Sequence, residues 1–159
     1  MLVLTLLLLA SLAVPWPPVF AQTETLPQVF QRVTGSVVVV RAKGRDLTAQ
    51  AGGTVLVKFN EVGSGVLVSA DGKVLTAAHV VQIADEITVE FLDGDVVPAK
   101  VVASEVRADL ALLQLARVPA GVQPAQLGDS ALTMIGEQIF IVGAPYGIAH
   151  ALKIGRAHV

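Results

Sequence analysis

The sequence contains no cysteine among its 159 residues. Disulfide bonds and cysteine–zinc sites therefore cannot stabilise its fold, and catalysis by a thiol is excluded. A lipid-anchored export signal also requires a cysteine, so an anchor of that kind is excluded as well. A bacterial protein that is exported to the periplasm or the extracellular space, and that folds without disulfides, fits this composition best.

Charged residues are also scarce, at 15% of the sequence, and the formal net charge is -2. This near balance provides no basic surface for DNA, RNA or anionic lipid, so we expect no nucleic-acid partner. The sequence has no His-Glu-x-x-His pattern, no acidic calcium loop and no phosphate-binding glycine loop, and we therefore predict no metal and no cofactor. A hairpin turn explains Asp93-Gly94-Asp95 better than a calcium site does.

Long apolar runs are limited to Leu2–Val14, which is too short for a membrane span because a span needs about 20 apolar residues. Prolines at 15, 17 and 18 end this run, and Val19-Phe20-Ala21 then offers compact residues at the positions that a signal peptidase reads. We therefore predict a secretory signal over residues 1–21, cleaved after Ala21, although no Lys or Arg precedes the run. No membrane span is expected after cleavage.

From Ser36 onward the sequence predicts an all-β fold. An entry segment at residues 22–35 precedes it, in which Gln22–Pro27 is polar and Gln28–Val33 would form one or two helical turns. Asp71-Gly72 and Asp93-Gly94 are strong signals of hairpin turns. Short strands at near-regular spacing are typical of a closed barrel or a sandwich. The segment between the glycines at 52–53 and 63–65 is predicted to be a mobile loop. The predicted strands are Ser36–Arg41, Gly65–Ser69, Lys73–Thr76, Ile87–Phe91, Val96–Ala103, Leu110–Leu115 and Gln138–Val142.

His79 and Asp109 are the residues with the clearest catalytic signature. His79 follows a predicted strand and two alanines, which suits a general base, because such a base must titrate near neutral pH and be held at a cleft. Asp109 directly precedes an apolar run, where burying its carboxylate is costly unless it is hydrogen-bonded. The Nδ1–H of a histidine would supply that bond and would fix the imidazole tautomer.

The surrounding motifs resemble those of a known family. Thr-Ala-Ala-His-Val-Val at 76–81, followed by Asp-Leu-Ala-Leu-Leu at 109–113, is similar to the His and Asp motifs of chymotrypsin-fold, trypsin-like serine proteases. Further motifs resemble the HtrA/Deg branch of that family, from about Gln28 to Leu152. These are Gly-Ser-Gly at 63–65, Leu-Gly-Asp-Ser at 127–130, Ile-Gly-Glu at 135–137 and Val-Gly-Ala-Pro-Tyr-Gly at 142–147. Ala77 departs from the pattern, since the family more often has Asn there.

The resemblance implies a chymotrypsin-like double β-barrel with the active site between the barrels. The first barrel would span residues 36–128, and residues 129–152 would form the link and the start of the second barrel. His79 would be the general base and Asp109 would orient it. The implied activity is that of a serine endopeptidase acting on unfolded or damaged exported polypeptides. The resemblance also implies C-terminal PDZ domains and a homotrimer for the complete protein.

The serine nucleophile of this family lies in a Gly-x-Ser-Gly-Gly turn, which the sequence does not contain. We therefore expect an N-terminal fragment that is inactive by itself. Ser130 follows Gly-Asp, as a trypsin-like serine would, but no glycines come after it, and it lies too close to Asp109 for the second-barrel strands to intervene. Ser64 is interpreted as a residue of tight strand packing. His150 is expected in an exposed loop and His158 in a non-native tail.

Residues 153–159 are predicted to be a non-native tail, because Ile154–Val159 resembles a translated sequencing adapter.

Two other functions stay open. One is a catalytically dead, protease-like binding module, whose glycine-rich turn would lack the serine. The other is an unrelated small β-barrel that binds a ligand, for which substitution of His79 would remove no hydrolytic activity.

Overall fold

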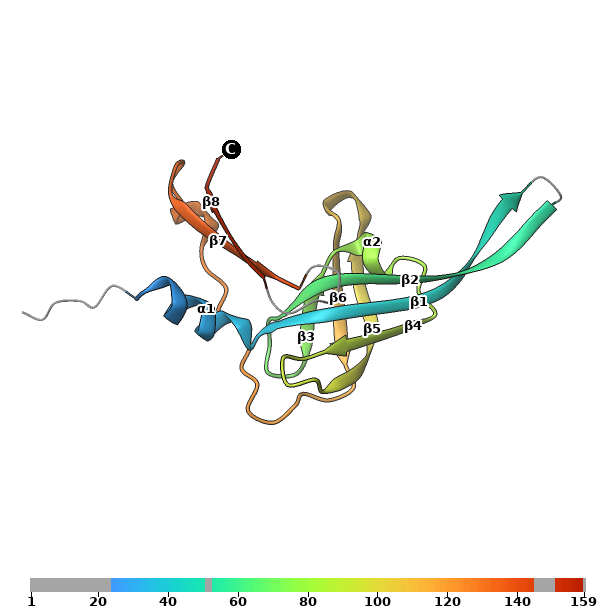
Figure 1. Ribbon diagram of the computed structural model, residues 1–159, viewed down its shortest axis with the longest axis horizontal. Helices are drawn as coiled ribbons and strands as arrows, with labels where there is room; N and C mark the ends of the chain where they lie inside the picture. The colour runs from blue at the N-terminus through green and yellow to red at the C-terminus, as the bar shows by residue number, and fades with distance from the viewer. Residues whose placement is uncertain (1–23, 51–52, 145–150, 159) are drawn as a thin grey trace, which may run out of the picture.

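The computed structural model describes residues 24–50, 53–144 and 151–158. Within them the chain forms a closed six-stranded barrel, a short N-terminal helix and a separate two-stranded sheet (Figure 1). The predicted signal peptide at 1–21 and His150 lie outside the described residues. None of the helices among the described residues is long and apolar enough to cross a membrane.

The barrel closes in the strand order β1-β2-β3-β6-β5-β4, and every neighbouring pair is antiparallel. This closure confirms the predicted all-β, chymotrypsin-like class. The barrel strands are β1 (Val37–Gln50), β2 (Gly53–Leu67), β3 (Lys73–Thr76), β4 (Glu86–Glu90), β5 (Val96–Glu105) and β6 (Leu110–Leu115). The other elements are α1 (Leu26–Thr34), α2 (Ala78–Val81), η1 (Val106–Ala108), η2 (Ser130–Leu132), β7 (Gln138–Gly143) and β8 (Ala151–Arg156).

Both predicted hairpin turns are present. Gly72 lies between β2 and β3 with φ 91°, and Gly94 lies between β4 and β5 with φ 85°, a region that favours glycine. The backbone N–H of Phe91 donates to the carbonyl oxygen of Asp95 at 2.9 Å across the second turn. The carboxylate of Asp95 also accepts two hydrogen bonds from the guanidinium of Arg117, at 2.6 and 2.7 Å. These contacts fix the β4–β5 turn against the chain that follows β6.

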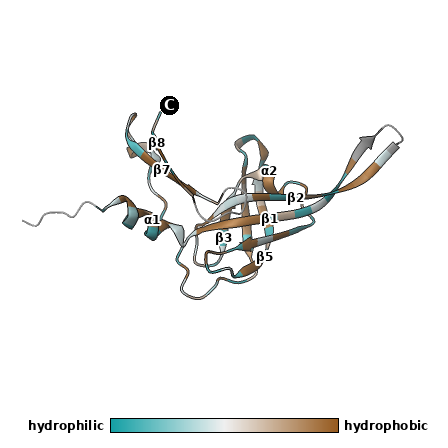
Figure 2. Cartoon of the chain, viewed as in Figure 1, coloured by the Kyte–Doolittle hydropathy of each residue, from teal (hydrophilic) through white to brown (hydrophobic). Residues whose placement is uncertain are grey.

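The barrel interior is filled by aliphatic side chains. Alternation of buried and less buried residues in β4 and β6 directs one face of each strand inward. Figure 2 shows the apolar stretch with which β1 enters the barrel in brown. The largest fully buried side chains are Leu67, Leu113, Val38, Val40, Val74, Val89 and Val97.

The prediction of a mobile loop between the glycines at 52–53 and 63–65 is wrong. Residues 53–65 belong to β2, which pairs with β1 from Val37 opposite Val66 to Gln50 opposite Gly53. Beyond Lys43, β1 no longer pairs with β4, so β1 and β2 continue as a two-stranded ribbon that projects from the barrel (Figure 1). β-Branched and aromatic residues favour strand over loop in this stretch, and the glycines at 53, 63 and 65 do not interrupt the pairing.

One face of the helix α1 is apolar and partly buried. Leu26, Val29, Phe30 and Val33 follow the spacing of an amphipathic helix, and all four are half-buried. The segment after the barrel ends in β7 and β8, which pair from Gln138 opposite Arg156 to Gly143 opposite Ala151. Residues of the predicted tail therefore form part of a strand in this structure.

Candidate active site

His79 is presented by a single helical turn whose other residues are anchored in the core. Ala78, Val80 and Val81 are buried, whereas the side chain of His79 is 68% exposed. Gly63 on β2 makes room for this turn, since a Cβ on Gly63 would lie 2.6 Å from a methyl of Val80. The apolar neighbours in the sequence therefore hold the turn while the imidazole projects outward.

Asp109 ends the turn η1 and directly precedes β6. Its φ of 52° and ψ of 43° place it in the left-handed region, and no other non-glycine residue in the described ranges has a positive φ. Aspartate tolerates this conformation better than most residues, because its short polar side chain can bond locally. Its carbonyl oxygen accepts the backbone N–H of Ala78 at 3.2 Å, which ties the two segments together.

The structure brings the two predicted site residues into direct contact. The Nδ1 atom of His79 lies 2.8 Å from Oδ2 and 3.0 Å from Oδ1 of Asp109. The backbone N–H of His79 also donates to Oδ1 at 3.0 Å. Asp109 thus orients both the backbone and the ring of His79.

The charge state of Asp109 follows from these bonds. Donation by the backbone N–H of His79, and then by its side chain, holds the pKa of the Asp109 carboxyl below its ordinary value. An ionised carboxylate can only accept hydrogen bonds, so Nδ1 of a neutral His79 carries its proton. The Nε2 atom is then free to accept a proton from a third group, as a general base must.

Both side chains are more open to solvent than the sequence interpretation suggested. The apolar run after Asp109 predicts a buried carboxylate, yet the side chain of Asp109 is 53% exposed. Leu110, the first residue of that strand, is also 51% exposed. The burial of β6 begins one residue later, at Ala111, so the polar pair lies at the rim of the barrel rather than inside it.

The other candidate residues have local structural roles. Ser130 is an exposed residue of η2, and the backbone N–H of Ala131 beside it donates to the carboxylate of Asp129 at 3.0 Å. The Nδ1 atom of His158 contacts the carbonyl oxygen of Arg156 at 3.2 Å, on an exposed segment. Asp93 accepts the backbone N–H of Asp95 within the hairpin turn.

Sequence interpretation missed part of what Ser64 does. Its Oγ accepts the backbone N–H of Ala144 at 2.9 Å, and its carbonyl oxygen accepts the hydroxyl of Thr76 at 2.9 Å. The first of these bonds joins residues 80 positions apart in the chain. The Gly-Ser-Gly motif signals close packing, but nothing in its composition identifies the distant partner.

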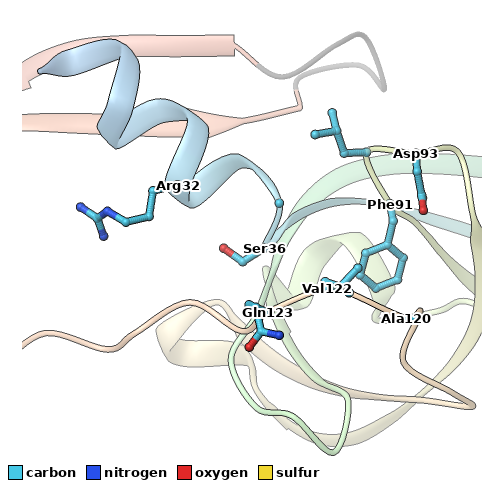
Figure 3. Close-up of a pocket in the computed structure, with 10 residues that line it drawn as sticks. Arg32, Ser36, Phe91, Asp93, Ala120, Val122 and Gln123 are labelled. Carbon is cyan, nitrogen blue, oxygen red and sulfur yellow. The ribbon is translucent and has the colours of Figure 1, made fainter.

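A cavity of about 470 Å³ lies elsewhere, between the end of α1, the β4–β5 turn and residues 120–123. Figure 3 shows the ring of Phe91 beside Val122, with Ser36 and Gln123 on another side of the cavity. Neither His79 nor Asp109 lines it. The cavity therefore adds no group to the His–Asp pair.

A closed six-stranded barrel with a His–Asp pair at its rim is half of a chymotrypsin-like fold. Residues 63–159 match the family model of the trypsin-like peptidase domain. The chain therefore belongs to the trypsin-like peptidases, and the relatives and solved structures that it resembles are proteases of the HtrA/Deg type.

Two curated relatives illustrate the likeness. A probable periplasmic serine endoprotease, DegP-like, from Ectopseudomonas mendocina is 39% identical over 94 residues, which is 59% of this chain and 19% of the relative. A probable periplasmic serine protease, do/HhoA-like, from Haemophilus influenzae is 36% identical over 98 residues, with 61% and 21% covered. The chain spans about a fifth of the length of these relatives.

Solved structures of HtrA-type proteases share the fold. A substituted form of the protease AlgW with a decapeptide superposes with a TM-score of 0.76 at 22% identity, over 83% of this chain and 44% of that one. AlgW with a tripeptide gives a TM-score of 0.66 at 26% identity, with 80% and 37% covered.

Proposed function

We propose that the complete protein is an exported serine endopeptidase in which His79 is the general base and Asp109 its orienting carboxylate. The observation that carries this proposal is the contact of 2.8 Å between Nδ1 of His79 and Oδ2 of Asp109. The membership of the chain in a family of serine proteases supports it. The nucleophile would be a serine in a Gly-x-Ser-Gly-Gly turn, which the 159 residues do not contain.

The proposed reaction is acyl transfer in two halves. The serine hydroxyl gives its proton to Nε2 of His79 as its Oγ attacks the peptide carbonyl carbon, and the imidazolium then gives that proton to the departing amine. In the second half, water attacks the acyl-serine and gives its proton to His79, which returns a proton to the serine as the carboxylic acid is released. Asp109 stabilises the imidazolium in both halves without taking up its proton. The 159-residue chain should be inactive by itself, since it supplies the base but neither the nucleophile nor an oxyanion hole.

The proposed substrates are unfolded or damaged proteins outside the cytoplasm. Two considerations support this choice: the relatives are named as periplasmic proteases, and structural neighbours of the HtrA type are described with bound peptides. Both barrels and any additional domains would belong to the complete protein, in which we propose C-terminal PDZ domains and a homotrimer.

Hydrolysis by the complete protein tests this function. We expect it to degrade casein, which is largely unfolded, faster than a stably folded globular protein of similar size. The His79→Ala variant should lose this activity while its circular dichroism spectrum stays unchanged. Equal degradation of folded and unfolded substrates would contradict the proposed substrate class, and full activity of the variant would contradict the proposed role of His79. A complete protein that folds but hydrolyses neither substrate would be the dead binding module.

We make one further proposal for each end of the chain. We propose that residues 1–21 are removed on export, so that N-terminal sequencing of the exported protein should begin at Gln22. We also propose that residues 153–159 are a sequencing scar, although several of them pair with β7 in this structure. Genomic DNA that encodes Ile-Gly-Arg-Ala-His-Val followed by a stop codon would contradict the second proposal.

A further inference from the structure

The outer face of β1 is covered as it crosses the barrel. Val38 and Val40 belong to the barrel core, whereas Val37 and Val39, which point to the opposite face, do not. Val37 and Val39 are nevertheless only 4% and 7% exposed. Another part of the chain must therefore pack on this outer face.

The end of β7 approaches this covered face. Ser64 pairs directly with Val39, so both side chains lie on the same side of the sheet. The Oγ atom of Ser64 accepts the backbone N–H of Ala144 at 2.9 Å, and Ala144 is fully buried. Gly143 fits closely here, since a Cβ on it would lie 3.2 Å from that Oγ. Ser64 thus joins the barrel to the chain that follows β7.

The same serine contacts the strand that leads to His79. Its carbonyl oxygen accepts the hydroxyl of Thr76, a residue that is 5% exposed and ends β3. Thr76 pairs with Gly65 on one side and with Ala111 on the other. It therefore lies between β2 and β6, where β6 begins directly after Asp109.

We propose that Ser64 is a positioning residue for His79. Through its Oγ it fixes where the chain after β7 starts, and through its carbonyl oxygen it fixes the end of β3, three residues before His79. This inference depends on the proposed function, in which the nucleophile comes from chain beyond β7 and must meet Nε2 of His79. A small change in that placement slows the reaction strongly, since about 1 Å of misplacement can cost about 100-fold in rate.

The first experiment tests the bond itself in the complete protein. Hydrogen exchange at the backbone amide of Ala144 is measured by NMR in the wild type and in Ser64→Ala. We expect exchange at least about tenfold faster in Ser64→Ala, because the amide loses its acceptor. Ser64→Thr keeps a hydroxyl and should restore slow exchange. Unchanged exchange in Ser64→Ala would overturn the inference at this step, whatever the activity.

Ser69→Ala is the matched control. Ser69 lies in the same β2–β3 hairpin, and its hydroxyl bonds with Asp71 and with the backbone N–H of Lys73. Ser69 is at the opposite end of β3 from His79. Its substitution therefore removes hydrogen bonds within the turn but none of those that join Ser64 to Ala144 and Thr76. Exchange at Ala144 should not change in this variant.

The second experiment measures kcat and KM of the complete protein on a peptide substrate. Ser64→Ala should lower kcat by about tenfold and change KM by less than about twofold, because Ser64 places the base without binding substrate. Ser64→Thr should restore kcat, and Ser69→Ala should leave it unchanged. Thr76→Val, which removes the other hydroxyl, should act like Ser64→Ala, whereas Thr76→Ser should not.

The outcomes separate this inference from the proposed function. A wild-type protein that hydrolyses the peptide, with unchanged kcat in both Ser64→Ala and Thr76→Val, overturns the positioning role alone. A folded wild-type protein without hydrolysis overturns the proposed function and with it the catalytic role of Ser64. Equal loss in Ser64→Ala and Ser69→Ala shows that general weakening of the hairpin is responsible, which also overturns the inference.

Discussion

Asp109 holds His79 at two points, the backbone N–H and the Nδ1 atom of the ring, at distances of 3.0 and 2.8 Å. A single carboxylate therefore sets both where the helical turn begins and how the imidazole is rotated. The left-handed backbone of Asp109 is part of this arrangement, since its carbonyl oxygen also bonds to Ala78. This pair is the basis of the proposed function.

The substitution Asp109→Asn tests the pair. Asn tolerates the left-handed backbone and can still accept the backbone N–H, so the fold should remain. Its amide group would face Nδ1 as a donor, which forces the proton of the ring to Nε2 and removes the base. In the complete protein kcat should fall by about 10⁴-fold, as the corresponding substitution does in chymotrypsin-like serine proteases. Asp93→Asn, in an exposed turn, is the control. A loss of less than about tenfold would contradict the role of Asp109.

Acid should destabilise the chain through a small set of carboxylates. The pKa of Asp95 is held low by the guanidinium of Arg117, and that of Asp71 by the side chains of Lys73 and Ser69. A carboxyl with a lowered pKa contributes stability above its unfolded value of about 4, and this contribution disappears as the pH falls through the folded value. The urea midpoint should therefore drop below pH 4, and less steeply in Asp95→Asn. An identical pH profile in that variant would contradict this account.

The glycines of the Gly-Ser-Gly motif are predicted to be required for packing. A Cβ on Gly65 would lie 2.8 Å from Val74 and 2.9 Å from Val40, within the barrel core. Gly65→Ala should lower the free energy of unfolding by about 1–3 kcal/mol because the core becomes overpacked. Gly128→Ala is the matched control, since nothing lies within 4 Å of its Cβ position. Urea unfolding measures both, and equal effects would contradict the packing explanation.

The projecting ribbon should be dispensable for folding. Arg45 pairs with Lys58, and residues between them extend β1 and β2 away from the barrel. Replacing residues 46–57 by Asn-Gly closes this pair with a two-residue hairpin turn. The exposed Leu47 and Leu56 are then removed, and the free energy of unfolding should change by less than about 1 kcal/mol. A variant that fails to fold would show that the ribbon stabilises the barrel.

Much of the barrel could be predicted because its signals are local. Gly72 and Gly94 mark tight turns, and the strands on either side of each turn pair as expected. Closure of the barrel could not be predicted from local signals, because β1 pairs with β4 and β3 pairs with β6 across long stretches of chain. The spacing of the strands left a barrel or a sandwich open, and the resemblance to a family selected the barrel.

The contact between Nδ1 of His79 and Asp109 could be expected from the sequence and is present in the structure, whereas the exposure and the backbone conformation of Asp109 could not be expected. His79 and Asp109 were singled out by sequence, yet the left-handed backbone of Asp109 has no sequence signal beyond the residue type. The ribbon was mistaken for a loop because glycines at 52–53 and 63–65 suggested two breaks. The contact of Ser64 with Ala144 depends on tertiary packing between distant segments, which no local pattern specifies.

Labelling of the complete protein with a fluorophosphonate, which reacts with activated serines, shows whether His79 activates a serine. We expect one labelled serine, in a Gly-x-Ser-Gly-Gly turn that follows the first barrel in the complete protein, and loss of labelling in His79→Ala. Gln114→Ala, a substitution away from the His–Asp pair, should label as the wild type does. Absence of labelling in a folded wild-type protein, or equal labelling of His79→Ala, would contradict a serine protease that uses His79 as its base.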